Sequence, residues 1–268
     1  MDRLREEQDL AAPFVFPAGP RQALLIHGFL GTPREMRPLA SALAEQNVTA
    51  SGLLLPGFGS DLPRLRHIRA EDWLEATRRE WKRVRQSSDY AALIGFSMGG
   101  AVALAVAADP ALAPDHLILI APHWRFADAR ARLLPVAKHV MREFRPFSAR
   151  DFEKPEVRKM FGALAPDADL DDPAVRQELI RQATIPTGAL DQLRRIGNFA
   201  AGSATSLHMP TTIVQGLQDA TSLPDYSRDL ARRTGAELVE VTGGHMIVDP
   251  DQPTWPLVRD VILSRVVQ

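Results

Sequence analysis

The sequence predicts an α/β fold with a mostly parallel central sheet, helices on both faces of the sheet and a helical cap inserted into it. Short apolar runs alternate with helix patterns through much of the chain. Each run is apolar on consecutive positions, which is typical of strands buried on both faces of a parallel sheet. One stretch of about 85 residues interrupts the alternation. We therefore expect a core formed from two parts of the chain, with this interruption between them.

The predicted strands are bounded by turn residues and fall on both sides of the interruption. They span residues 23–29, 48–56, 90–96, 116–122, 211–216 and 236–243. Because connections in such folds are short and run through helices, neighbouring strands in this series are expected to be parallel.

The first predicted helix begins at Thr32, where Thr-Pro-Arg-Glu has the pattern of a capping box. Pro33 takes the first helical position, and the Glu35 side chain is expected to bond back to the cap residue. Apolar residues then recur at helical spacing and form one face for packing on the sheet: Met36, Leu39, Ala40, Leu43 and Ala44.

Two further helices are predicted between the strands of the first part. One covers residues 70–87 and places Trp73, Thr77, Trp81 and Val84 along one side. The other begins at the glycine pair after Ser97 and ends at Asp109-Pro110. This alternation of strand and helix indicates a doubly wound sheet.

The interruption predicts a helical cap at residues 123–206, between core segments 1–122 and 207–268. A structureless connection of this length is uncommon, and we expect helices at 128–144, 155–164, 173–184 and 187–201. The aromatic residues of this stretch suit two interpretations, an apolar acyl pocket or simple packing of cap helices on the core: Phe126, Phe144, Phe147, Phe152, Phe161 and Phe199.

The composition limits the possible functions. The chain has 268 residues, 45% of them hydrophobic, which is enough for one large core. It has no cysteine, which excludes disulfides, thiolate metal sites and a cysteine nucleophile. A formal net charge of −1 provides no field that would attract nucleic acid or an anionic membrane. We expect a small-molecule partner and no nucleic acid, while a monomer and a homodimer are equally compatible with the sequence.

No targeting or membrane-spanning segment is predicted. The first residues, MDRLREEQDLAAPF, are charged and lack the apolar core of a signal peptide. No uninterrupted apolar run reaches about 18 residues. We therefore expect a soluble, cytoplasmic protein without membrane insertion.

The pentapeptide Gly-Phe-Ser-Met-Gly at residues 95–99 has the pattern G-x-S-x-G. Alone this pattern is weak, because a simple turn that contains serine gives the same letters. Its position between a buried strand and a helix of small residues is that of a nucleophile elbow, a strained turn that exposes a serine hydroxyl. Gly95 and Gly99 would let strand and helix approach closely. Ser97 would then lie at a helix N-terminus, where negative charge is favoured.

A nucleophilic serine needs a base to accept its proton and an acid to orient that base. Among the seven histidines, His245 follows the last predicted strand and a turn at Gly243-Gly244. His123 directly follows a strand and is a candidate for lining the pocket. Four others lie in loops, at a strand start or in the cap, where solvated or packed histidines are more common: His67, His116, His139 and His208.

Two aspartates follow the strand at 211–216 and compete for the role of the acid. Asp219 lies in the loop after the strand. Asp225 lies in the first turn of the next helix, where an aspartate usually serves the helix dipole. We therefore predict Asp219. The order Ser97, Asp219, His245 is that of the α/β-hydrolases.

An oxyanion hole requires two backbone N–H donors near the nucleophile. Met98, the residue after Ser97, supplies one candidate. Phe29 supplies the other, because it follows His27-Gly28 in the loop after the first predicted strand, although these two residues also suit an ordinary strand-ending turn. His27, His123 and Trp124 are candidates for contacting the substrate.

Several segments resemble the bacterial carboxylesterase and monoacylglycerol-lipase branch of the α/β-hydrolase superfamily. They are LLIHGFLGTPREMRPLA, LLLPGFGSD, EDWLEA, IGFSMGGAVAL, VQGLQDATSLPD and GGHMIVDPD, within residues 21–122 and 207–268. The resemblance implies Ser97 as nucleophile, His245 as general base and acid, Asp219 as its orienting acid, and Phe29 and Met98 as oxyanion donors. It also implies no metal and no organic cofactor.

The expected activity is cleavage of carboxylic esters, with short-to-medium acyl chains or monoacylglycerol-like substrates. Three alternatives keep the fold: a thioesterase or amidase, a C–C bond hydrolase or perhydrolase, and a non-catalytic ligand-binding receptor. Dehalogenases and epoxide hydrolases are disfavoured, because their nucleophile is an aspartate where Ser97 stands.

Overall fold

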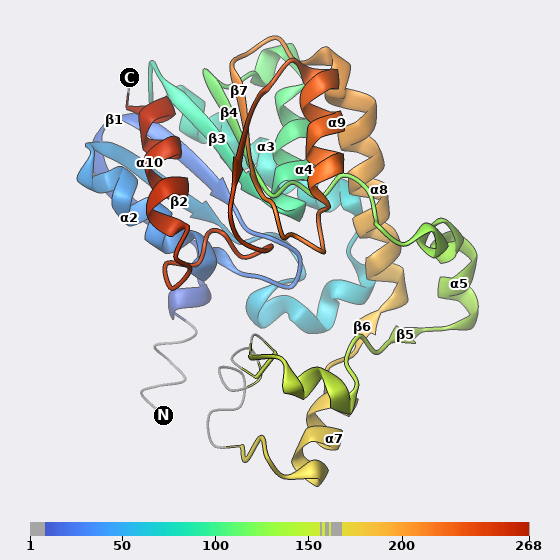
Figure 1. Ribbon diagram of the computed structural model, residues 1–268. Coiled ribbons are helices and arrows are strands. Elements are labelled where there is room, and N and C mark those ends of the chain that lie inside the picture. Colours follow the sequence, from blue (N-terminus) through green and yellow to red (C-terminus); the bar gives the residue numbers. More distant parts are fainter. Residues whose placement is uncertain (1–8, 156, 159–160, 162–167, 268) are drawn as a thin grey trace. The chain divides into compact units, whose positions relative to one another are not determined.

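Six strands form one sheet in the order β2-β1-β3-β4-β7-β8, and each neighbouring pair is parallel (Figure 1). This is the sheet in the part of the chain that the computed structural model describes, residues 9–155, 157–158, 161 and 168–267. Its strands are β1 (Phe14–Ile26), β2 (Val48–Leu53), β3 (Ala91–Phe96), β4 (His116–Ile120), β7 (Thr211–Gly216) and β8 (Glu237–Val241). The predicted α/β class and parallel sheet are confirmed.

Helices cover both faces of this sheet. They are α2 (Arg37–Glu45), α3 (Ala70–Gln86), α4 (Met98–Ala107), α9 (Pro224–Thr234) and α10 (Trp255–Val266). Helix α8 (Thr187–Ser203) begins in the inserted stretch and leads back toward β7 in the sequence. Side chains of α2 and α10 share one core cluster with alternate strand residues, such as Leu25 and Ile94. Intervening strand residues, such as Leu24 and Leu93, are also fully buried and project to the opposite face, where α3 and α4 pack (Figure 1).

Strand β1 begins at Phe14, well before the expected start at residue 23. Its first half contains Pro17, Gly19 and Pro20, which the sequence pattern disfavours in a strand. The register against β2 shifts repeatedly there, from Phe14 opposite Gly52 to Pro20 opposite Val48. The irregular pairing accommodates the prolines, and this is why the apolar pattern did not predict it.

The predicted capping box at Thr32 is wrong. Residues Pro33–Met36 form a 3-10 helix, and the Thr32 side chain makes no capping hydrogen bond. The Glu35 carboxyl does not return to the cap residue but accepts a hydrogen bond from Gly28 N–H, with 2.5 Å between the two atoms. The apolar face that follows is confirmed, since Met36, Leu39, Ala40 and Leu43 are all buried.

The chain divides into two compact units, of which the larger comprises residues 1–131 and 192–268 and the smaller Arg132–Asp191. The smaller unit lies within the range expected for the cap. In its described part it contains α5 (Leu134–Val140), β5 (Glu143–Phe144), a 3-10 helix (Ala149–Glu153), α7 (Pro173–Gln182) and β6 (Ile185–Pro186). Strand β4 pairs directly with β7, with Leu117 opposite Thr211, although this whole stretch separates them in the sequence.

Two of the helices expected in the cap were placed well, and one was not. Helix α7 begins after Asp172, whose side chain caps it, and α8 begins at Thr187. The single helix expected at 128–144 is instead broken, because β5 pairs with the distant β6. The helix expected at 155–164 falls mostly outside the described residues.

Aromatic side chains form the interior of the smaller unit. Phe152 and Phe161 are buried and stack, with ring centroids 4.8 Å apart, and Phe147 meets Phe161 edge-on at 5.2 Å. These rings pack against one another, which favours the packing interpretation for them. Phe126 belongs to the larger unit and contacts the ring of His123.

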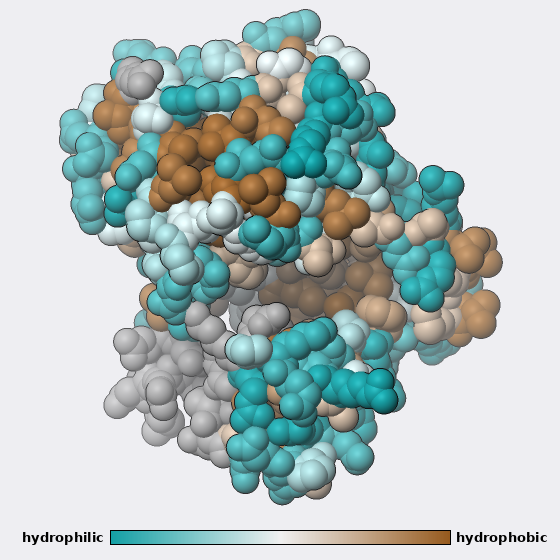
Figure 2. Space-filling view, viewed as in Figure 1, coloured by the Kyte–Doolittle hydropathy of each residue, from teal (hydrophilic) through white to brown (hydrophobic). Residues whose placement is uncertain are grey.

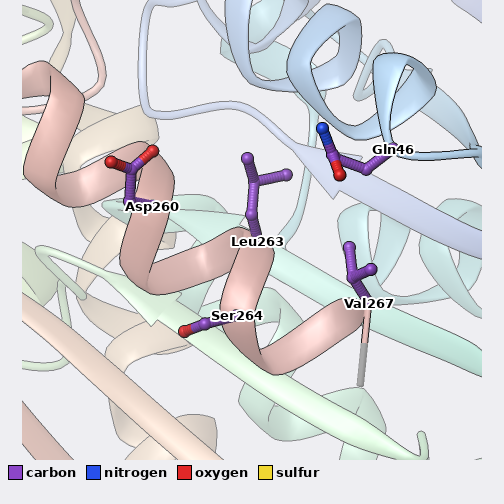
Figure 3. Close-up of a pocket in the computed structure, with 5 residues that line it drawn as sticks. All are labelled: Gln46, Asp260, Leu263, Ser264 and Val267. Atoms are coloured by element: carbon purple, nitrogen blue, oxygen red, sulfur yellow. The ribbon is translucent and has the colours of Figure 1, made fainter.

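Several large hydrophobic side chains around α5 are exposed, and Figure 2 shows them as brown groups at the right-hand edge. They are Leu133, Val136, Val140, Met141 and Phe144. A pocket in the larger unit lies beside α10 and is lined by Gln46, Asp260, Leu263, Ser264 and Val267 (Figure 3). Within the described ranges, no helix combines the length and the hydropathy that a membrane span requires.

Candidate active site

All the predicted site residues follow strands of the central sheet. Phe29 lies after β1, Ser97 after β3, His123 after β4, Asp219 after β7 and His245 after β8. Because these strands are parallel, their carboxyl ends meet at one edge of the sheet, where α/β proteins bind ligands. The fold therefore brings side chains from distant parts of the sequence to one edge.

Ser97 occupies a strained turn between β3 and α4. Its backbone has φ of +52° and ψ of −117°, a conformation that L residues rarely adopt. A Cβ atom on Gly99 would lie 2.3 Å from the carbonyl oxygen of Ile26, and one on Gly95 would lie 2.3 Å from that of Gly99. The two glycines of the pentapeptide thus allow a backbone approach that no other residue permits.

Backbone hydrogen bonds fix this turn. Ser97 N–H donates to the carbonyl oxygen of Ile120 at 2.9 Å. The carbonyl oxygen of Ser97 accepts from His123 N–H and from Gly100 N–H, both at 3.0 Å. The nucleophile turn is therefore tied to the end of the neighbouring strand β4.

The hydroxyl of Ser97 lies within hydrogen-bond distance of a histidine. Its Oγ is 2.9 Å from Nε2 of His245. The imidazole packs against the ring of Phe96, with centroids 5.1 Å apart. This distance lets Nε2 accept the hydroxyl proton, as a general base must.

Asp219 holds the other side of the imidazole, with its Oδ2 atom 2.8 Å from Nδ1 of His245. Its Oδ1 atom accepts hydrogen bonds from Thr221 N–H and Ser222 N–H at 2.8 and 2.9 Å. Burial raises the pKa of Asp219, but the bonds and charge of His245 and these two N–H groups outweigh it, and the net pKa is lowered. At neutral pH Asp219 is therefore a carboxylate, and it is placed to accept a hydrogen bond from Nδ1 of His245.

Asp225, the competing aspartate, does not approach the histidine. Its side chain is 83% exposed and pairs with Arg228 in the first turn of α9. The structure thus brings Ser97, His245 and Asp219 together and leaves Asp225 at the surface.

Gln215 is a buried neighbour of the acid that the sequence analysis missed. Its Nε2 atom lies 3.2 Å from Asp219 Oδ2 and 3.0 Å from the carbonyl oxygen of Ser222. The Ser227 hydroxyl donates to Gln215 Oε1. The single amide side chain in the buried strand TTIVQG was the signal for such a role.

The loops that carry the acid and the base are joined through their backbones. Leu217 N–H donates to Val241 and Gln218 N–H to Gly243, at 2.8 and 2.9 Å, which extends the β7–β8 ladder beyond the strands. A Cβ atom on Gly216 would lie 2.3 Å from the carbonyl oxygen of Gly244. The relative position of Asp219 and His245 is thus set by a continuous backbone ladder.

The two candidate oxyanion donors are available. In the described part of the chain, neither Phe29 N–H nor Met98 N–H has a recorded acceptor. Met98 is the first residue of α4, where an N–H group has no partner within the helix. The Phe29 ring meets Phe58 and Trp73 edge-on, at 5.7 and 6.5 Å between centroids, which anchors the loop after β1.

His27 supports this loop from inside the protein and is not placed to contact a substrate. It is fully buried, Nε2 accepts from Leu55 N–H at 3.1 Å, and Nδ1 lies 2.8 Å from the carbonyl oxygen of Gly28. Because Nε2 accepts, the proton is assigned to Nδ1. Burial lowers the pKa of His27 to about 4, so the ring is neutral near pH 7.

The contacts of Trp124 differ from those expected of a residue that binds substrate. Its Nε1–H donates to the carbonyl oxygen of Tyr226 in α9 at 3.0 Å, and the Arg125 guanidinium stacks on the ring. The expectation that Trp124 contacts a substrate is therefore not supported.

His123 keeps the features of a contact residue. It is 5% exposed, its N–H binds the Ser97 carbonyl, and its Nε2 has no partner in the described ranges. Burial, with a smaller effect of the nearby His245, lowers the pKa of His123 to about 4. A buried, neutral imidazole therefore lies next to the nucleophile turn. No cluster of three or more metal-binding side chains occurs among the residues described.

Curated proteins match part of the chain, among them two from Bacillus. A thermostable monoacylglycerol lipase from Bacillus sp. (strain H-257) is 35% identical over 97 residues, 36% of this chain and 39% of the lipase. A carboxylesterase from Bacillus subtilis (strain 168) is 32% identical over 100 residues, 34% of this chain and 38% of the esterase. The chain thus matches about two fifths of the length of each relative.

A solved structure and a family match cover far more of the chain. The structure comes from work on the metagenome-derived lipolytic enzymes LipS and LipT; it has a TM-score of 0.75 at 20% identity and covers 96% of this chain and 97% of that one. At this identity the likeness establishes the fold. The family described as serine aminopeptidase, S33, matches residues 20–244. The chain therefore has the α/β-hydrolase fold and belongs to the serine aminopeptidase S33 family.

Proposed function

We propose that the protein is a serine hydrolase that cleaves carboxylic esters through an acyl-serine intermediate. The observation that carries this proposal is the pair of hydrogen bonds that links Asp219, His245 and Ser97, at 2.8 and 2.9 Å. A buried carboxylate, an imidazole and a serine hydroxyl in this order form the catalytic triad of acyl transfer.

In the first step, Ser97 Oγ attacks the ester carbonyl carbon while His245 Nε2 accepts the hydroxyl proton. Asp219 stabilises the imidazolium that forms and holds the Nδ1 proton. The carbonyl oxygen becomes an oxyanion, to which Phe29 N–H and Met98 N–H donate. Such donors are fixed before the reaction and are worth about 3 kcal/mol each in the transition state.

The intermediate then collapses, and the leaving alkoxide takes the proton from His245 Nε2. The acyl group remains on Ser97 Oγ. A water molecule attacks this acyl-serine while His245 accepts one of its protons, and that proton then returns to Ser97 as the carboxylic acid departs. The acid ionises to a carboxylate and releases one proton to solvent. Atoms and charge balance over the cycle, which consumes one water per ester.

Short-to-medium acyl esters or monoacylglycerol-like esters are the proposed substrates. The names of the two Bacillus relatives support this class. We assign a substrate contact to His123, because its buried Nε2 is unpaired among the residues described and lies beside the nucleophile turn. A hydrogen-bonding group on the substrate would satisfy it, since an unpaired buried polar atom costs free energy.

The test compares wild type with Ser97→Ala on p-nitrophenyl esters of graded chain length and with a fluorophosphonate probe. We expect Ser97→Ala to lose the label and to lower kcat on the order of 10⁶-fold. Ser41→Ala, on the exposed surface of α2, is the matched control and should behave as wild type.

Other outcomes separate the alternatives. Undiminished turnover by Ser97→Ala would contradict the proposed mechanism. Labelling of wild type without ester turnover would indicate that the substrate is a thioester, an amide or a compound with a cleavable C–C bond. Absence of both labelling and turnover in wild type would indicate a ligand-binding receptor.

A further inference from the structure

Glu35 lies below the loop that carries the Phe29 donor. It belongs to the 3-10 helix Pro33–Met36, and its Oε1 atom accepts the hydrogen bond from Gly28 N–H at 2.5 Å. Nothing in the proposed chemistry uses this side chain directly. A partly buried acid that bonds to backbone one residue before a proposed oxyanion donor therefore needs an explanation.

The loop is shaped around the Glu35 carboxyl group. A Cβ atom on Gly31 would lie 2.5 Å from both carboxyl oxygens, and one on Gly28 would lie 3.3 Å from Oε1. Between them Leu30 has φ of +62°, in the left-handed region that a leucine rarely adopts. Two glycines and one strained residue thus make room for the carboxyl group and wrap the backbone over it.

Glu35 and His27 hold Gly28 from opposite sides. Glu35 accepts from the Gly28 N–H group, while the Nδ1–H of His27 donates to the Gly28 carbonyl oxygen at 2.8 Å. The two bonds fix both peptide planes that meet at Gly28. Gly31 N–H donates to the same Gly28 carbonyl oxygen at 3.2 Å, so the second plane has a backbone partner, whereas Glu35 is the acceptor for the Gly28 N–H of the first plane. Restraint of both planes matters because glycine has the greatest backbone freedom.

The direction of Phe29 N–H depends on this arrangement. In a trans peptide, the carbonyl of Gly28 and the N–H of Phe29 lie in one plane and point in opposite directions. A flip of that plane would turn the donor away from the site and present a carbonyl oxygen to the developing negative charge.

We propose that Glu35 is a positioning residue for the oxyanion hole, which accepts the Gly28 N–H bond and so keeps Phe29 N–H directed at the reacting carbonyl. This inference rests on the proposed acyl-transfer function. The role requires a hydrogen-bond acceptor and no charge. Burial raises the pKa of Glu35 to about 7, so acid and carboxylate forms coexist near neutrality, and both can accept.

A pair of nearly isosteric variants separates the acceptor from side-chain volume. Glu35→Gln keeps an acceptor oxygen, and Glu35→Met removes it. We expect kcat of Glu35→Met on p-nitrophenyl butyrate to fall roughly tenfold to hundredfold with KM within about threefold, because only the transition state loses a donor. Glu35→Gln should stay within about threefold of wild type. Glu45→Met, at an exposed glutamate of α2, is the matched control.

Inhibition by a trifluoromethyl ketone reports on the oxyanion directly, since the ketone forms a tetrahedral adduct with serine. Its affinity should fall in Glu35→Met by about the same factor as kcat. A role in folding alone would lower the unfolding midpoint but leave ketone affinity and kcat of the folded fraction unchanged. That result would overturn the proposal.

Gly31→Ala tests the same bond without removing Glu35, and it serves if Glu35→Met does not fold. The new Cβ would displace the carboxyl group from Gly28. We expect a similar fall in kcat, and no additional fall when Gly31→Ala and Glu35→Met are combined. Unchanged kcat in folded Gly31→Ala would contradict the inference. If wild type neither labels nor turns over, the proposed function fails instead, independently of Glu35.

Discussion

Ser97 and Phe29 follow neighbouring strands, yet the turns that carry them are held in different ways. The Ser97 turn is fixed by backbone, through bonds to Ile120 and His123 and through contacts that only glycine allows. The Phe29 turn has one backbone bond, from Gly31 N–H to the Gly28 carbonyl oxygen at 3.2 Å. It is otherwise held by side chains, the carboxyl of Glu35 and the ring of His27. A turn held by backbone contacts requires particular residues, such as glycine, next to one another in the sequence. A turn held by side chains requires suitable residues elsewhere in the chain. We therefore expect substitutions in the Ser97 turn to lower the stability of the protein, and substitutions around the Phe29 turn to lower its activity.

The largest expected effect concerns a further contact between side chains, the bond between Asp219 and His245. In Asp219→Asn, the amide oxygen can still accept from Thr221 and Ser222, so the fold should persist. The amide no longer holds the Nδ1 proton of His245 as a carboxylate does, and kcat should fall by about 10⁴-fold. Steady-state kinetics with a thermal melt measure both quantities.

Asp225→Asn is the control for this experiment. Its side chain is exposed and pairs with Arg228, so kcat should stay within about twofold of wild type. An equal loss in both variants would mean that the acid has been assigned wrongly. A large loss of stability in Asp219→Asn would contradict the expectation that this substitution lowers kcat while the fold persists.

Gly99→Ala tests the backbone-held turn. The added Cβ would meet the carbonyl oxygen of Ile26 at 2.3 Å, and backbone cannot easily move away. We expect the free energy of unfolding to fall by about 3 kcal/mol, measured by urea titration. Gly202→Ala in α8 meets open space and should change stability by less than about 1 kcal/mol, in the stabilising direction. Wild-type stability in Gly99→Ala would contradict the close approach.

The smallest expected effect is a pH dependence specific to the side-chain-held loop. Burial raises the pKa of Glu35 to about 7 in the folded protein, above its ordinary value of 4.5. The folded state then binds more protons than the unfolded state between these values, so this group's contribution to stability is lost as pH rises through 7. The advantage of wild type over Glu35→Gln should shrink by about 1–3 kcal/mol from pH 5 to pH 8.

Urea unfolding of both proteins at the two pH values measures this difference. His27, His123 and Asp219 have lowered pKa values and titrate with the opposite effect on stability, but they are present in both proteins and cancel. A difference that does not change with pH would show that the Glu35 carboxyl titrates as it does in water.

Much of the core could be predicted from local pattern, because the central strands β3 and β4 are buried and apolar at nearly every position. The first half of β1 could not, since Pro17 and Pro20 conflict with that pattern and its pairing to β2 is irregular. The β5–β6 pair could not either, because two-residue strands carry no periodicity and depend on contact between distant segments.

The candidate site divides in the same way. Ser97, His245 and Asp219 could be selected because each follows a predicted strand in an informative order. The prediction that Glu35 closes a capping box was wrong. Its carboxyl group bonds to Gly28 N–H and not to the residue at the start of the helix. His27 was expected at the substrate for a similar reason: the sequence shows which residue stands in the loop but not which way its ring turns.

The direct pairing of β4 with β7 has a consequence for how this chain can evolve. The two strands are hydrogen-bonded neighbours, with Leu117 opposite Thr211, although residues 121–210 lie between them in the sequence. The intervening stretch can therefore gain, lose or exchange residues without shifting the register that aligns the strand ends. Insertions and deletions within Arg132–Asp191 lie outside the strands that precede Ser97, Asp219 and His245.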